Sequence, residues 1–86
     1  MAKIVTADEI REYVLVAYIQ PAIRHREKTV TFTSSDIHNG MGLKGRFPLV
    51  CSSIDADKFL EYASVTLVKR EGPKENTTVR WVFALQ

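Results

Sequence analysis

The sequence predicts a small α+β domain with three helices, a short strand and a C-terminal β-hairpin. Its 86 residues leave room for one domain, spanning 1–86. Of these residues, 45% are hydrophobic and 26% are charged, as in ordinary globular proteins. Apolar residues recur at helical spacing through the first two thirds of the chain and alternate with polar residues near its end. Helices followed by paired strands define this class.

The first predicted helix begins after Thr6. The segment from Thr6 to Glu9 fits a capping box, in which the Thr6 hydroxyl and the Glu9 carboxylate each bind an otherwise unpaired backbone N–H. Pro21 lacks an N–H and is expected to kink or end this helix. The apolar residues that follow the cap recur every three or four positions, which places on one face Ile10, Tyr13, Val14 and Ala17.

A strand and two further helices follow. Val30 and Phe32 alternate with threonines and predict the strand Thr29–Thr33. Ser34 or Ser35 is suited to cap a short second helix. The glycines after that helix indicate a turn, and Pro48 suits the first position of the third helix, Pro48–Leu60.

The end of the chain predicts a β-hairpin. Its strands are expected within 65–69 and 78–85, because apolar and polar residues alternate in both. Turn-forming residues and charges fill the segment between them, Glu71–Asn76. One face of the second strand carries Val79, Trp81, Phe83 and Leu85.

This order of elements resembles the winged helix-turn-helix superfamily over nearly the full chain. In that resemblance Ser34–Met41 is the first helix of the motif, Gly42–Arg46 is its turn and Pro48–Leu60 is the recognition helix. The strand Thr29–Thr33 would pair with the hairpin, and Arg70–Thr77 would be the wing. The resemblance implies a recognition helix in the major groove of DNA and a wing on the backbone or minor groove.

The resemblance and the distribution of charge together predict a set of DNA-binding residues. The formal net charge is only +2, but basic residues gather around the predicted turn and the wing. Asp55 and Asp57 depart from the pattern, because they place negative charge on the helix that should approach phosphates. The predicted DNA-binding residues are Lys44, Arg46, Ser52, Lys58, Lys69, Arg70, Lys74 and Arg80.

Two functions follow from these patterns. The first is a small duplex-DNA-binding protein that acts as a transcription regulator through its third helix and its wing. The alternative is a protein-interaction adaptor with the same fold, which the near-neutral charge and the acidic third helix favour. Charge reversal at Arg70 and Lys74 distinguishes them, because only DNA binding should weaken and lose salt dependence.

Catalysis, a metal and a cofactor are not expected. His38 follows Ser34, Ser35 and Asp36 within about one helical turn, whereas a catalytic triad needs side chains that converge from separate elements. The possible metal ligands Cys51, His25 and His38 lack the spacing of known zinc motifs.

The first helix also predicts a homodimer. It is apolar around much of its circumference, and excess apolar surface on a helix implies burial against another molecule. The residues beyond its main apolar face are Leu15, Val16, Tyr18 and Ile19. Cytoplasmic localisation is expected, because Cys51 is the only cysteine and neither a membrane-spanning run nor a signal peptide is recognisable.

Overall fold

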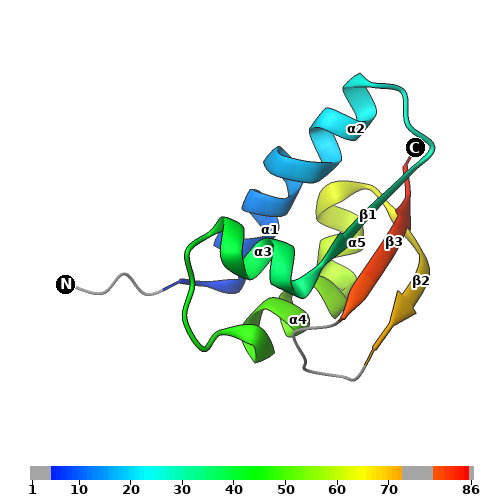
Figure 1. The fold of residues 1–86 in the computed structure, drawn as a ribbon. Helices are drawn as coiled ribbons and strands as arrows, with labels where there is room; N and C mark the ends of the chain where they lie inside the picture. Colours follow the sequence, from blue (N-terminus) through cyan, green and yellow to red (C-terminus); the bar gives the residue numbers. More distant parts are fainter. Residues whose placement is uncertain (1–4, 73–78, 86) are drawn as a thin grey trace.

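The computed structural model describes residues 5–72 and 79–85 and has the predicted α+β class. A nearly continuous helix comes first, followed by a strand, three shorter helices and two more strands (Figure 1). In chain order the elements are α1 (Ala7–Val14), the π-helical segment η1 (Leu15–Ile19), α2 (Gln20–Arg24), β1 (Thr29–Thr33), α3 (Ser34–Gly40), α4 (Phe47–Asp55), α5 (Asp57–Ala63), β2 (Thr66–Glu71) and β3 (Arg80–Ala84).

The three strands form one antiparallel sheet in the order β1-β3-β2. The predicted strand Thr29–Thr33 is confirmed, and it pairs with the second strand of the hairpin, with Phe32 opposite Trp81. The pairing of β2 with β3 is irregular between Leu67 and Lys69. As a result Lys69 lies opposite Val82.

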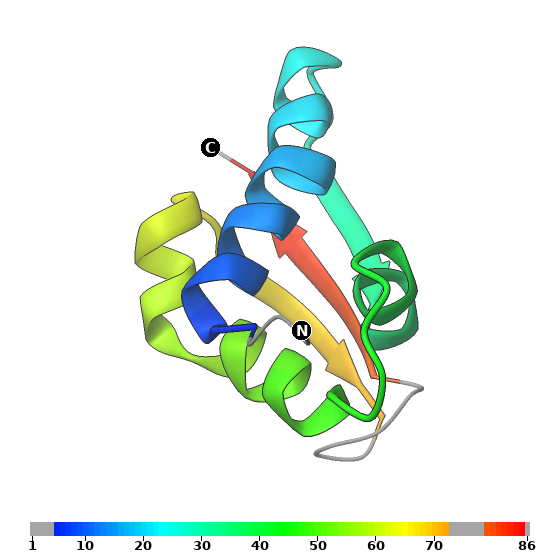
Figure 2. The same ribbon diagram turned by 90° about the vertical axis from the view of Figure 1, so that its left-hand side faces the viewer.

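The helices cover one face of the sheet, with the long helix crossing in front of it in Figure 2. Side chains of β3 alternate accordingly: Trp81 and Phe83 are buried against the helices, whereas Arg80 is exposed on the open face. Phe32 stacks on Phe83 with ring centroids 5.6 Å apart, and both rings belong to the buried core. Among the described residues, no helix is both long and apolar enough to cross a membrane.

The first helix continues past Pro21 and ends at Arg24, because a wider turn precedes the proline. In this turn the N–H of Gln20 donates to the carbonyl of Leu15, five residues back. Pro21 then lies in the first turn of α2, where no N–H is needed. The extra residue rotates the inward face, so Ile19 is buried and Ala17, which the spacing placed on the apolar face, is exposed.

The cap of α3 is Thr33, and the prediction of Ser34 or Ser35 was wrong. The N–H of Asp36 donates to Thr33 Oγ1 and the N–H of Thr33 donates to Asp36 Oδ2, both at 3.0 Å. Thr33 is the last residue of β1, so its backbone is already extended, as an N-cap requires. The side chain of Ser34 is buried instead.

The predicted third helix Pro48–Leu60 is broken at Ala56 into α4 and α5. Ala56 has an extended backbone, with ψ of 142°. In an unbroken helix Phe59 would lie on the side opposite to Val50, because nine residues correspond to two and a half turns. The break lets both side chains enter the core, where each is fully buried. A helical period assumed across the break therefore missed Phe59.

Candidate nucleic-acid interface

The turn between α3 and α4 is held by His38. This side chain is buried, and its Nε2 accepts a hydrogen bond of 3.2 Å from the backbone N–H of Arg46. Its ring also stacks on Phe47, with centroids 3.9 Å apart and planes 11° apart. Gly42 and Gly45 both have positive φ, which most other residues adopt only at an energetic cost. These contacts fix the point at which α4 begins.

The outward side of the first two turns of α4 carries small, uncharged residues. Pro48 and Ser52 are exposed, and the Ser52 hydroxyl donates to the carbonyl of Leu49 at 3.1 Å, which leaves its oxygen able to accept. Just before the helix, Lys44 and Arg46 are exposed, and neither side chain forms an ion pair with a described residue. We call the exposed residues Lys44, Arg46, Pro48 and Ser52 the α4 surface.

The other end of α4 is fastened to the sheet by Asp55. The guanidinium of Arg70 donates to both carboxylate oxygens of Asp55, with distances of 2.8 and 3.0 Å. The indole Nε1 of the fully buried Trp81 donates to Asp55 Oδ1 at 2.8 Å. The hydrogen bond with Asp55 raises the pKa of Arg70. Arg70 also donates to the carbonyl of Gly72 at 3.1 Å, so the start of the hairpin loop is fixed beside the end of α4.

The structure brings together only part of the predicted DNA-binding set. Lys44, Arg46 and Ser52 share the α4 surface, and Arg70 lies at its far end with its guanidinium bound to Asp55. Two other predicted residues, Lys69 and Arg80, lie on the open face of the sheet, away from the helices. Lys74 is outside the described residues.

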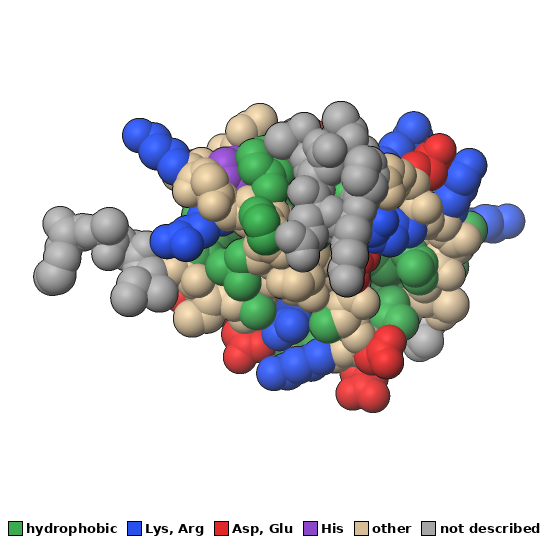
Figure 3. Space-filling model, turned by 90° about the horizontal axis from the view of Figure 1, so that it is seen from below, with side chains coloured by type: hydrophobic (Ala, Val, Ile, Leu, Met, Phe, Trp, Pro, Cys, Tyr) green, Lys and Arg blue, Asp and Glu red, His purple; other side chains and the backbone are tan. Residues whose placement is uncertain are grey.

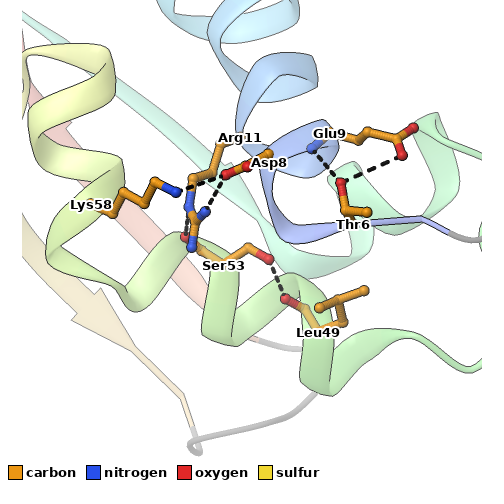
Figure 4. A network of polar contacts seen from close by, with 7 residues as sticks. All are labelled: Thr6, Asp8, Glu9, Arg11, Leu49, Ser53 and Lys58. Atoms are coloured by element: carbon orange, nitrogen blue, oxygen red, sulfur yellow. Dashed lines mark hydrogen bonds and ion pairs between the residues drawn. The ribbon is translucent and has the colours of Figure 1, made fainter.

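Lys58 lies elsewhere, on α5 beside the beginning of α1. Its Nζ is 3.2 Å from Asp8 Oδ1, and Arg11 Nη1 is 2.8 Å from the same oxygen (Figure 4). Both cations lower the pKa of Asp8, and Lys58 has the larger effect. Arg11 also donates to the backbone carbonyl of Ser53 at 3.0 Å, which ties α1 to α4. Lys58 therefore belongs to the packing of α1, α4 and α5.

Figure 3 views the molecule from the end at which α4 lies in Figure 1. Lys and Arg side chains stand at both ends of this view, and most of the visible Asp and Glu side chains lie along its lower edge. Other Lys and Arg side chains lie among the acidic ones at this lower edge, so the two signs of charge are only partly separated on this side.

Three positioning residues were not recognised from the sequence as such: His38, Asp55 and Trp81. Their hydrogen bonds join residues 8, 15 and 26 positions apart, and no local motif marks such pairs. Asp55 was noted only for its negative charge, and His38 only as a weak candidate for catalysis or metal binding.

The residues at 5–72 and 79–85 contain no cluster of three or more side chains suited to hold a metal ion. The sequence matches no protein-family model, and comparisons with curated proteins and with solved structures found no match either.

Proposed function

We propose that this protein binds duplex DNA as a winged helix-turn-helix domain, with α4 in the major groove and the β2–β3 hairpin against the backbone. The element order supports the proposal, because β1 precedes α3 and α4 and the hairpin follows them. The sheet order β1-β3-β2 supports it too, because the short strand pairs with the hairpin as the resemblance implies. Helix α5 is an addition to this pattern.

The observation that carries the proposal is the charge of the α4 surface. In the sequence, the negative charges of Asp55 and Asp57 argue against contact between this helix and phosphates. In the structure, the Asp55 carboxylate is matched by the guanidinium of Arg70, and Asp57 belongs to α5. Among the described residues, every negative charge on the outward side of α4 therefore has a positive partner. An α-helix also has the right width for the major groove.

Lys44 and Arg46 supply positive charge where α4 begins. The N-terminus of a helix carries partial positive charge and favours anions such as phosphate. Two exposed cations beside it add to this field, and their contact with phosphates would release condensed counterions from DNA. His38 holds the backbone at Arg46, so the start of α4 is already ordered before DNA binds.

The test is a fluorescence-anisotropy titration of a mixed-sequence duplex at several salt concentrations. The variant is K44E/R46E, and the matched control is R26E/K28E, which reverses two exposed charges with the same spacing in the connector after α2. Each variant changes the formal net charge from +2 by four units, to −2. The two connectors lie at opposite ends of the molecule (Figure 1).

We expect K44E/R46E to bind much more weakly than the control. The dependence of log K on log salt should also become shallower by roughly 1.8, about 0.9 for each lost phosphate contact. Equal losses in both variants would assign the effect to net charge and contradict an interface at α4. An unaltered protein that fails to bind DNA even at low salt would refute the proposal itself.

The edge strand β2 favours a second candidate function, a protein-interaction adaptor. Leu67 and Val68 are exposed there, and an unpaired strand edge can accept a strand from another protein. The same titration separates the two candidates, since an adaptor that does not bind DNA shows no salt-dependent anisotropy change.

A further inference from the structure

The long helix α1–η1–α2 has an outward side that no described element covers. Of the apolar residues from which the sequence predicts a dimer, Ile19 is buried and Leu15 and Tyr18 pack partly against the core. Val16 stays 55% exposed, and Ile23, which that prediction did not include, is 47% exposed. We call the exposed residues of this side the outer stripe: Glu12, Val16, Ala17, Gln20, Ile23 and Arg24.

The outer stripe is acidic at one end, basic at the other and uncharged between them. Glu12 lies at the α1 end and Arg24 closes the α2 end. Val16, Ala17, Gln20 and Ile23 fill the middle, and the exposed Ala17 leaves room for another backbone to approach closely. Two such stripes side by side in the same direction would set like charges together. In opposite directions they would pair Glu12 with Arg24 twice.

A hollow beside the α1 end of the stripe fits the apolar residue at its α2 end. The hollow measures about 400 Å³ and is lined by Glu9, Glu12, Tyr13, Val16 and Met41. Its apolar and aromatic members suit an aliphatic side chain, and its carboxylates suit a neighbouring cation. Ile23 followed by Arg24 offers this combination in consecutive residues.

We propose that two copies of this protein associate through their outer stripes, antiparallel and crossing near Ala17. At about 1.5 Å per residue, Ile23 lies roughly 9 Å from the crossing, and Glu12 lies a similar distance on the other side. Ile23 of one copy therefore meets the hollow of the other, and Arg24 meets Glu12. A twofold axis repeats both contacts, which makes the surface self-complementary. This pairing does not depend on DNA binding.

Sedimentation equilibrium tests the proposal, from low micromolar to several hundred micromolar protein. We expect the apparent mass to rise from the 9.8 kDa of one chain towards twice that value. Ala17→Glu places two carboxylates against each other at the crossing and should weaken the dimer at least about tenfold. The exposure of Ala17 keeps the fold intact, which far-UV circular dichroism verifies.

A charge exchange tests the direction of the two helices. Glu12→Arg and Arg24→Glu should each weaken the dimer, and the double variant E12R/R24E should recover it, because the pair is re-formed with opposite sign. Lys44→Glu, an exposed charge reversal away from the stripe, should leave the dimer unchanged. A protein that stays monomeric at every concentration overturns the proposal. A dimer that all these variants leave unchanged overturns it as well, since association then uses another surface.

Discussion

Replacing Asp55 by Ala removes the contact that fastens α4 to the sheet. Two donors lose their acceptor at once, the indole N–H of Trp81 and the guanidinium of Arg70. Trp81 is fully buried, so its N–H has no access to water in the folded protein. The side chains of Arg70 and Asp55 are 23% and 28% exposed, so solvent partly screens their ion pair.

The structure sets the expected magnitude. A buried donor left without a partner costs about 1–3 kcal/mol. A partly exposed ion pair contributes only about 0.2–1 kcal/mol. Asp55→Ala should therefore lower the free energy of unfolding by roughly 1–4 kcal/mol, a large share of the roughly 4–13 kcal/mol expected for a protein of this length. The corresponding decrease in Tm is about 4–30 °C.

Asp55→Asn separates the two contributions. The amide oxygen can still accept from Trp81, so only the attraction to Arg70 is lost, and the decrease should stay below about 1 kcal/mol. Urea denaturation followed by circular dichroism measures both variants. Fluorescence is a second probe, since Trp81 is the only tryptophan. Coincident transitions justify a two-state analysis.

The reasoning is refuted by an Asp55→Ala variant within about 0.5 kcal/mol of the unaltered protein, the range of ordinary surface substitutions. It is also refuted if Asn and Ala at this position are equally destabilising. In that case the hydrogen bond from Trp81 would have no measurable part in stability.

Two further predictions concern other contacts. Lys58 lowers the pKa of the exposed Asp8 below its ordinary value of 3.8, so the stabilisation from this pair is present above that value and is lost as pH falls through the folded-state pKa. Asp8→Asn should therefore be slightly less stable than the unaltered protein at neutral pH and equally stable in strong acid. Urea titrations at both pH values measure this difference in stability. A difference that persists in acid contradicts the assignment. A Cβ at Gly40 would collide with the hydroxyl of Tyr13, so Gly40→Ala should lose about 1–3 kcal/mol although alanine favours helices. Adding Tyr13→Phe should restore much of this loss in thermal melts, and no recovery would mean that the collision is not its cause.

Local chemistry explains which parts of the fold the sequence predicted. The cap at Thr6 and the strand Thr29–Thr33 depend on residues within a few positions of one another. The alternation of apolar and polar residues also placed Trp81 and Phe83 on the inner face of the hairpin. The exposure of Lys44 and Arg46 could also be predicted from nearby residues, because both lie in a glycine-rich turn between two helices.

The places where prediction failed depend on partners distant in the chain. The break at Ala56 lets both Val50 and Phe59 enter the core. A single unbroken helix cannot bury both side chains on one face, because they lie two and a half turns apart. The wider turn before Pro21 rotates one half of the long helix against the other, so Ala17 became exposed.

The site shows the same division between local and long-range effects. Residue type and order indicated a basic turn and a basic hairpin. The tertiary fold placed Lys58 against Asp8 and bound Arg70 to Asp55, thereby withdrawing two of the predicted cations into ion pairs within the protein. The physical reason is that a charge is neutralised by whichever opposite charge folding brings within a few ångströms, and the distance between two residues in the sequence does not determine that separation in space.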